Sequence, residues 1–222
     1  MMSIAIQVSQ LSKTFGRRVV LEEVDLAVAE GESVVFTGAN GAGKTTLLRC
    51  VASIIRPSSG EVRWFGQPVV GNTAARRLVG MVAHESRSYP HLTLRENLIF
   101  AARMCDVPRP QRRVDLLLDN VGLGLHAQRT PAVLSQGMRQ RLAVARALVH
   151  DPPILLLDEP FAGLDAEGTR WLLGLLSDIR GQGRTLCLVL HDEEKKRLLA
   201  DRVLELRQGR IRQQAAALAR AA

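Results

Sequence analysis

A glycine-rich run between two segments of regular structure constrains the fold of this chain more than any other feature. The run reads Gly38-Ala39-Asn40-Gly41-Ala42-Gly43-Lys44-Thr45. The apolar residues 33–37 before it predict a buried strand, and residues 45–55 after it predict a helix. Glycines let backbone N–H groups converge on phosphate oxygens, and the positive end of the following helix faces the same anion. The run therefore predicts a phosphate-binding loop.

Two polar residues at the end of the loop have separate expected roles. Lys44 is expected to reach the β- and γ-phosphates of a nucleotide, and the Thr45 hydroxyl to bind Mg²⁺. A structural turn that carries Lys-Thr by chance would require neither the strand nor the helix, so we favour nucleotide binding. The candidate nucleotide-binding residues in this segment are Gly38, Asn40, Gly41, Gly43, Lys44, Thr45 and Thr46.

A second signal is an acidic pair that follows the apolar residues 154–157. Asp158 and Glu159 are expected at the C-terminal edge of a sheet, where open α/β sheets bind their ligands. Asp158 would hold Mg²⁺ through water, and Glu159 would orient the attacking water or accept its proton. Alone, such a pair is commonly a solvated strand end. Together with the phosphate loop, it predicts a P-loop nucleoside triphosphatase that uses Mg²⁺.

The run Leu134-Ser135-Gln136-Gly137-Met138-Arg139-Gln140-Arg141, whose serine lies 23 residues before Asp158, resembles the signature sequence of ABC ATPases. Ser135 is expected to cap the helix that begins there. The resemblance implies that Ser135 and Gly137 contact the γ-phosphate of ATP bound by the opposite subunit, so that two chains enclose two nucleotides. The family has glycine and glutamine where this chain has Gln136 and Met138.

Three further residues gain roles from the same resemblance. Asp165, in Gly163-Leu164-Asp165, matches the loop through which the two subunits of this family communicate. His191 matches the switch histidine near the γ-phosphate, so that the predicted catalytic pair is Glu159 and His191. Phe15 matches the aromatic residue that stacks on adenine, for which an aromatic face is suited. A core phenylalanine and an incidental histidine are the alternatives.

One motif departs from the family. Where the family has a glutamine that binds Mg²⁺ and contacts the membrane partner, this chain has His84 and then Glu85 after residues 79–83. The Glu85 carboxylate is the expected Mg²⁺ ligand, because Mg²⁺ prefers oxygen over imidazole nitrogen. Which of the two residues replaces the glutamine stays open at this point.

The fold expected from these features is a single α/β domain over residues 1–222. A chain of 222 residues is long enough for one well-buried core. Strands are expected at 4–8, 24–28, 61–65 and 186–190, and a helix at 169–180 would make a βαβ crossover. The resemblance implies a mostly parallel P-loop core, an N-terminal antiparallel β part, and an inserted helical subdomain over approximately 86–150.

Composition limits where such a chain acts. No segment approaches the roughly 18–20 apolar residues that cross a bilayer, so another chain would span the membrane. The three cysteines are widely separated, which argues against a disulfide framework and a zinc site. The net charge of +8 favours an anionic partner or is a solvated basic surface. We expect a peripheral protein on the cytoplasmic face of the cell membrane, with an integral membrane subunit and either a second copy or a paired ATPase subunit.

Which class of transporter this chain belongs to is indicated only by its resemblance to particular subfamilies. Residues 60–68, 84 and 92–98 resemble the ATP-binding subunit of the cytochrome c biogenesis (haem) exporter, and a drug or lipid exporter is the second candidate. A non-transport ABC ATPase acting on the ribosome or nucleic acid is a different class. It is disfavoured because the chain has neither a second phosphate loop nor a heptad run, and we expect no nucleic-acid partner.

Overall fold

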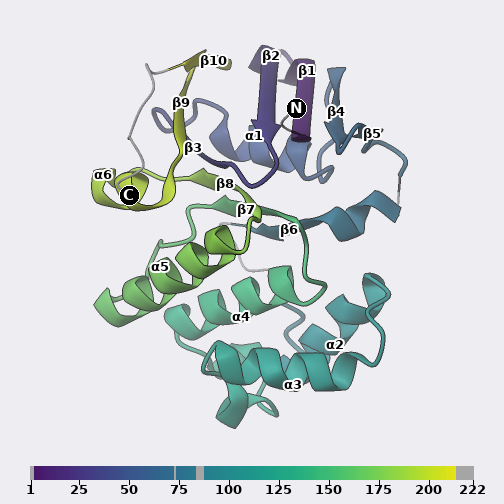
Figure 1. The fold of residues 1–222 in the computed structure, drawn as a ribbon, viewed down its shortest axis with the longest axis vertical. Helices are drawn as coiled ribbons and strands as arrows, with labels where there is room; N and C mark the ends of the chain where they lie inside the picture. The colour runs from purple at the N-terminus through teal and green to yellow at the C-terminus, as the bar shows by residue number, and fades with distance from the viewer. Residues whose placement is uncertain (1–2, 73, 84–87, 214–222) are drawn as a thin grey trace.

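The computed structural model describes residues 3–72, 74–83 and 88–213. Two sheets and a helical lobe follow one another along the long axis (Figure 1). Helix α1 (Lys44–Val51) lies between the sheets, whereas α4 (Gln136–Leu148) and α5 (Ala166–Gly181) cover the other face of the central sheet. Among the described residues, no helix is long and apolar enough to cross a membrane.

The smaller sheet is antiparallel and has the strand order β2-β1-β4-β5. Its strands are β1 (Ile4–Phe15), β2 (Arg18–Ala29), β4 (Ser59–Trp64) and β5 (Gln67–Pro68). This confirms the expected N-terminal antiparallel part. Strand β1 is longer than the alternation of its first five residues predicts, because it continues through several register shifts as far as the turn into β2.

The central sheet has the order β10-β9-β3-β8-β7-β6. Its strands are β3 (Ser33–Thr37), β6 (Val79–Val82), β7 (Ile154–Asp158), β8 (Thr185–Val189), β9 (Arg202–Arg207) and β10 (Arg210–Gln213). Only the β9–β10 pair is antiparallel, so the expected mostly parallel core is confirmed. The expected crossover is also confirmed, because α5 connects the neighbouring parallel strands β7 and β8.

The helical lobe has an apolar core of its own. It contains α2 (Leu94–Met104), α3 (Pro110–Asn120) and the short turns η2 (Gly124–His126) and η3 (Pro131–Val133), packed on α4. Thr93 is the N-cap of α2 and forms a capping box. Its hydroxyl accepts a hydrogen bond from the Glu96 N–H, and the Glu96 carboxylate accepts one from the Thr93 N–H. Two further short elements in the described residues are η1 (Ala74–Leu78) and α6 (Glu193–Leu199).

The main core encloses α1 between the two sheets. Leu11, Phe36, Leu47 and Trp64 are each at most 1% exposed in it. Cys187 in β8 belongs to the same core, and burial raises the pKa of its thiol to about 12. Cys187 is therefore a small residue of the apolar core. This packing fixes α1 against the sheet edge from which the phosphate loop emerges.

Gly38 is the residue at which β3 enters the phosphate loop, and we expect its replacement by alanine to destabilise the fold. Its φ is +137°, and an added Cβ would lie 2.2 Å from the Leu206 carbonyl oxygen in β9. We expect Gly38→Ala to lower the free energy of unfolding by about 3 kcal/mol. The melting temperature, followed by circular dichroism, should fall by about 6–12 °C.

Gly174→Ala is the matched control for Gly38→Ala. Gly174 lies inside α5, and an added Cβ there would meet no atom within 4 Å. Alanine in a helix interior is more favourable than glycine by about 0.5–1 kcal/mol, so this variant should melt slightly above the wild type. Equal melting temperatures for the two variants would contradict the close approach of Gly38 to β9.

Candidate nucleotide-binding site

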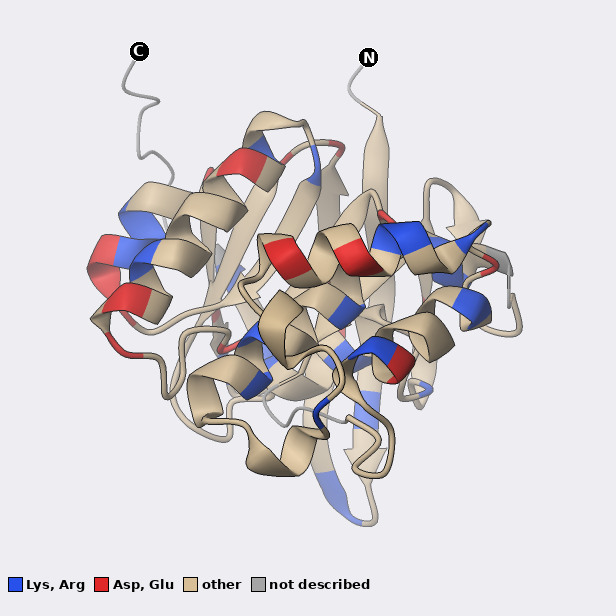
Figure 2. Cartoon of the chain, turned by 90° about the horizontal axis from the view of Figure 1, so that it is seen from below, with Lys and Arg blue, Asp and Glu red and all other residues tan. Residues whose placement is uncertain are grey.

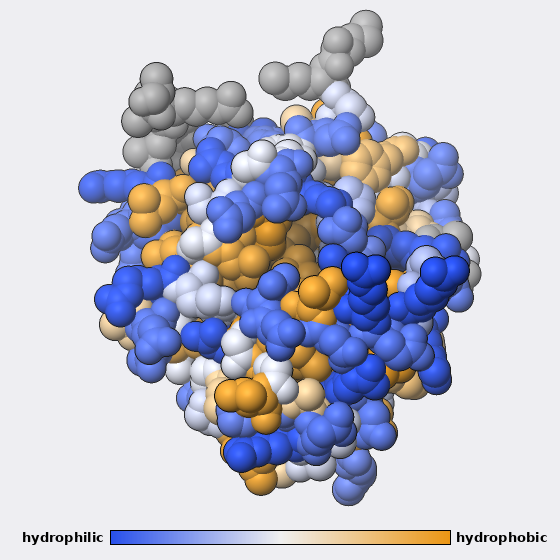
Figure 3. Space-filling view, turned by 60° about the horizontal axis from the view of Figure 1, so that its bottom comes forward, coloured by the Kyte–Doolittle hydropathy of each residue, from blue (hydrophilic) through white to orange (hydrophobic). Residues whose placement is uncertain are grey.

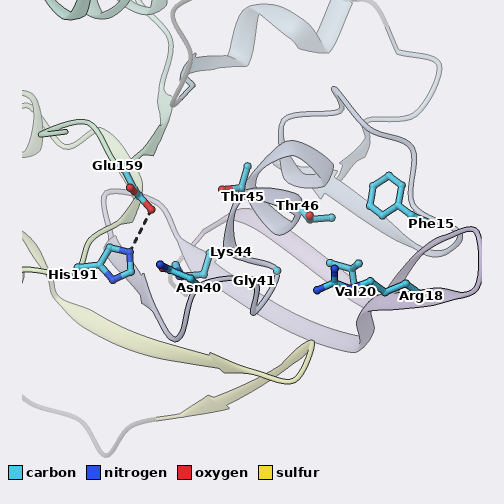
Figure 4. Close-up of a pocket in the computed structure, with 11 residues that line it drawn as sticks. Phe15, Arg18, Val20, Asn40, Gly41, Lys44, Thr45, Thr46, Glu159 and His191 are labelled. Atoms are coloured by element: carbon cyan, nitrogen blue, oxygen red, sulfur yellow. Dashed lines mark hydrogen bonds and ion pairs between the residues drawn. The ribbon is translucent and has the colours of Figure 1, made fainter. Parts of the chain in front are cut away.

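The phosphate loop opens into a cavity of about 830 Å³ at the C-terminal end of β3 (Figure 4). The loop, the β1–β2 hairpin and the ends of β7 and β8 all contribute to its wall. Most of the residues expected at a nucleotide site come together here. The lining residues are Phe15, Arg18, Val20, Asn40, Gly41, Gly43, Lys44, Thr45, Thr46, Glu159 and His191.

Lys44 is the first residue of α1 and lies almost entirely inside the loop. Its side chain is buried, and its Nζ donates hydrogen bonds to the carbonyl oxygens of Gly38 at 2.8 Å and Ala39 at 3.0 Å. Burial lowers the pKa of the ammonium group, whereas the nearby carboxylates of Glu159 and Asp158 oppose that shift. The loop thus holds a cation at its floor, close to two carboxylates.

Thr45 lines the cavity and is hydrogen-bonded to Asp158, a buried residue outside the cavity lining. The Thr45 hydroxyl donates to Asp158 Oδ1 at 3.1 Å, and Asp158 is only 1% exposed at the end of β7. The described residues contain no group of three or more His, Cys, Asp or Glu that could hold a metal by itself. A hydroxyl and one carboxylate nevertheless fit Mg²⁺, which is commonly held by few protein oxygens together with substrate phosphates and water. Glu85, the other expected ligand, lies outside the described residues.

Glu159 and His191 face each other at the mouth of the cavity (Figure 4). Glu159 directly follows β7 and His191 follows the end of β8, and Glu159 Oε1 lies 3.3 Å from His191 Nε2. Both side chains are partly exposed, at 32% and 47%. A carboxylate in this position can accept a proton from water or orient it, and an imidazole can donate to a neighbouring oxygen.

The backbone at Glu159 is strained, and the following loop is held by a contact that the sequence did not reveal. Glu159 has a φ of +50°, a region that residues other than glycine occupy rarely. Gln140 in α4 donates from Nε2 to the Pro160 carbonyl oxygen at 2.7 Å. A glutamine that binds a distant carbonyl leaves no pattern in the sequence, so this support for the loop is visible only in the structure.

Phe15 ends β1 at the rim of the cavity and is 49% exposed. The alternative that Phe15 is a core residue is therefore wrong. The ammonium of Lys13 lies 4.9 Å from the centre of the Phe15 ring. Arg18 and Val20 line the cavity from the neighbouring strand β2, and sequence reasoning missed both. Neither belongs to a motif, and only their placement beside the loop gives them a role.

Four residues expected at the nucleotide do not line this cavity: Gly38, at the start of the loop, and Ser135, Gly137 and Asp165. Ser135 caps α4 by accepting a hydrogen bond from the Met138 N–H at 3.2 Å, which confirms the expected cap. Asp165 caps α5 and accepts from the Gly168 N–H at 2.7 Å. Gly137 follows in the first turn of α4, where an added Cβ would lie 3.8 Å from the Leu164 side chain. The signature run and the Gly163–Asp165 loop are thus neighbours, apart from the phosphate loop of their own chain.

Comparison with known proteins places these observations in one family. The family model described as "ABC transporter" matches residues 21–162. The chain is 39% identical over 221 residues to the sulfate/thiosulfate import ATP-binding protein CysA of Salmonella typhi, covering 94% of this chain and 59% of that protein. It is 40% identical over 219 residues to CysA of Photorhabdus laumondii, covering 94% and 60%. The chain thus spans about three fifths of the length of these relatives.

Solved structures show the same fold. A dimeric post-hydrolysis state of the ATP-binding cassette MJ0796, bound to ADP and phosphate, superposes with a TM-score of 0.87 at 28% identity, covering 95% of this chain and 98% of that one. An ATP-binding subunit of an ABC transporter superposes with a TM-score of 0.88 at 28% identity, covering 96% and 90%. From the family match, supported by the ordered motifs and the shared fold, we conclude that this chain belongs to the ABC transporter family.

Proposed function

We propose that this chain is the subunit of an ABC transporter that binds and hydrolyses ATP and drives a separate membrane subunit. The observation that carries the proposal is one cavity lined by the phosphate loop and the Glu159–His191 pair, with Asp158 hydrogen-bonded to the lining residue Thr45. Each of these groups serves a different part of phosphoryl transfer: binding the phosphates, holding a metal ion, and activating water.

In the proposed mechanism each group binds a different part of the nucleotide, the metal ion or the attacking water. Phe15 stacks on the adenine, and the loop N–H groups with Lys44 hold the β- and γ-phosphates. Thr45 and Asp158 would hold Mg²⁺, which supplies positive charge against the phosphate oxygens. Glu159 orients the attacking water and accepts its proton. The His191 imidazole, beside that carboxylate, contacts the γ-phosphate.

A second ATPase subunit completes the proposed site. Ser135 and Gly137 stand at the N-terminus of α4, where helix N–H groups favour an anion, yet they do not line the cavity of their own chain. We assign them to the γ-phosphate held by the opposite subunit, with Asp165 in the loop beside them. The structure of MJ0796 with ADP and phosphate is dimeric, which supports this assignment by analogy. A second copy of this chain or a paired ATPase subunit would serve equally.

The proposed contact with the membrane subunit is a groove on the helical lobe. The groove has a volume of about 240 Å³, and its rim exposes Tyr89, Phe100 and Met104 at 48%, 41% and 68%. The Tyr89 and Phe100 rings pack edge to face with centroids 4.9 Å apart. Apolar side chains are exposed among hydrophilic ones on the lower face of the molecule (Figure 3). Such a groove suits an amphipathic helix. His84 and Glu85 lie outside the described residues, so their part in coupling stays a prediction.

The surface charge argues against the nucleic-acid alternative. Although the net charge is +8, Lys and Arg are interspersed with Asp and Glu over the face seen from below (Figure 2). Several arginines are paired with carboxylates, among them Arg63, Arg95 and Arg210. A nucleic-acid-binding protein usually gathers its cations into one patch or stripe.

Two observations bear on the transported molecule. Haem export rests on the resemblance of residues 60–68, 84 and 92–98 alone. The relatives at 39% and 40% identity are named for sulfate and thiosulfate import, so the comparisons favour an anion importer over a haem, drug or lipid exporter. The cargo contacts the membrane subunit, and identification of that subunit decides between them.

The test is capture of the membrane subunit by a hydrolysis-deficient variant. Tagged Glu159→Gln protein with Mg-ATP, incubated with detergent-solubilised membranes, should recover an integral membrane protein identifiable by mass spectrometry. Adding Phe100→Glu should lower that recovery about tenfold or more, because it places a charge in the docking groove, while ATP binding is unchanged. Recovery of ribosomal proteins or nucleic acid instead would overturn the transport function.

A further inference from the structure

The hairpin that presents Phe15 also presents a cation beside it. Strand β1 ends at Phe15 and β2 begins at Arg18, and the two residues pair directly across the two-residue turn. Residues paired in this way point to the same side of a hairpin. Both side chains accordingly line the nucleotide cavity. Arg17, in the turn itself, does not line it.

The guanidinium of Arg18 lies over the phosphate loop. A Cβ added at Gly41 would be 3.8 Å from Arg18 Nη2, and no other atom outside the chain neighbours of Gly41 would be within 4 Å of it. Figure 4 shows the Arg18 side chain extending from the hairpin toward Gly41. Gly41 has a φ of +78° and carries no side chain, so nothing from the loop stands between its backbone and the guanidinium.

Arg18 has no carboxylate to neutralise it within the described part of the chain. No ion pair or side-chain hydrogen bond is formed by its guanidinium there, whereas Arg210 in β10 is paired with Glu22 of β2 at 2.9 Å. An unpaired guanidinium that faces a cavity offers a planar fork of donors to an anion. Its charge is therefore available to a ligand of that cavity.

The order of groups along the cavity identifies that anion. Phe15 marks the adenine end, and Lys44 marks the end where the β- and γ-phosphates bind; Arg18 lies between them, next to Gly41. The part of a nucleotide between the base and the β-phosphate is the ribose and the α-phosphate, and of these the phosphate is the partner for a guanidinium. Resting on the ATP-binding function proposed above, we infer that Arg18 binds the α-phosphate of the nucleotide.

The test compares Arg18→Gln with Arg17→Gln, its neighbour in the turn, in the full chain. Dissociation constants for ATP, ADP, AMP and adenosine are measured by calorimetry or by competition with a fluorescent nucleotide. Because ATP, ADP and AMP share the α-phosphate, Arg18→Gln should weaken all three by about tenfold and leave adenosine unchanged. Arg17→Gln should bind all four like the wild type. Arg18→Lys should recover part of the lost affinity, since lysine keeps the positive charge but lacks the planar guanidinium donors.

The possible failures are distinguishable. If the wild type binds ATP while Arg18→Gln and Arg17→Gln are indistinguishable, the role of Arg18 is wrong and the proposed function stands. A loss for ATP alone would place the guanidinium at the γ-phosphate, and a loss for ATP and ADP but not AMP would place it at the β-phosphate. An equal loss for adenosine would place it at the ribose or base. Each of these results overturns the inference. Absence of ATP binding by the wild-type chain would overturn the proposed function itself.

Discussion

Replacing Glu159 by glutamine is expected to lower the rate of ATP hydrolysis by about 100- to 1,000-fold while ATP still binds. The amide has nearly the shape of the carboxylate but cannot accept a proton from the attacking water. Glu159 is placed for that task by the end of β7, with its Oε1 3.3 Å from His191 Nε2. Phosphate release under steady-state conditions measures the rate, and nucleotide binding is measured on the same preparation.

Glu167→Gln provides the matched control for Glu159→Gln. Glu167 is a carboxylate in the first turn of α5, 82% exposed and 4.0 Å from Arg141, and it does not line the nucleotide cavity. Exposed ion pairs of this kind contribute about 0–1 kcal/mol, so this variant should hydrolyse ATP like the wild type. Turnover by Glu159→Gln within twofold of the control would show that Glu159 neither orients water nor accepts its proton.

The second large effect is expected on binding rather than on the chemical step. Lys44→Ala should weaken ATP binding by about 100-fold or more, because it removes the buried cation that reaches two phosphates at once. Charge-assisted hydrogen bonds contribute about 1.5–3 kcal/mol each, and two of them correspond to a loss of that size. In the structure the ammonium already lies inside the loop, held by the carbonyl oxygens of Gly38 and Ala39.

Two controls make the Lys44 result interpretable. Lys195→Ala removes a lysine that is paired with Asp192 at 2.8 Å and does not line the cavity, and it should bind ATP normally. Thermal unfolding of Lys44→Ala, followed by circular dichroism, tests whether the fold persists. If Lys44→Ala is stably folded and binds ATP as tightly as the wild type, the assignment of the phosphate loop to nucleotide binding is wrong.

Local sequence signals were sufficient for the strands and helices that surround the phosphate loop. Strands β3, β7 and β8 are short apolar runs, and in the structure β7 and β8 are buried along their whole length. Such runs signal buried parallel strands without reference to the rest of the chain. Helix α1 is shorter than the expected 45–55, because it ends at Val51 and the chain turns through Ser53 with a φ of +57°.

Other elements were not predictable, because their stability comes from their neighbours. Strands β9 and β10 contain several arginines and lack a long apolar run; they exist because β9 pairs with β3 and β10 pairs with β9. Helix α6 has only seven residues, too few for a helix that is stable by itself. It begins at the Asp192 cap, which accepts from the Lys195 N–H at 3.0 Å.

The sequence by itself determined the phosphate loop, the acidic pair and the family, because glycine spacing, a lysine and a strand end are features of contiguous residues. Only the tertiary structure decided which groups share the cavity. Thr45 meets Asp158 across 113 residues, and Glu159 meets His191 across 32. The order of parallel strands in the central sheet sets these distances. Arg18 lies beside Gly41 because β2 of the smaller sheet packs against the phosphate loop, and no contiguous stretch of sequence encodes that packing.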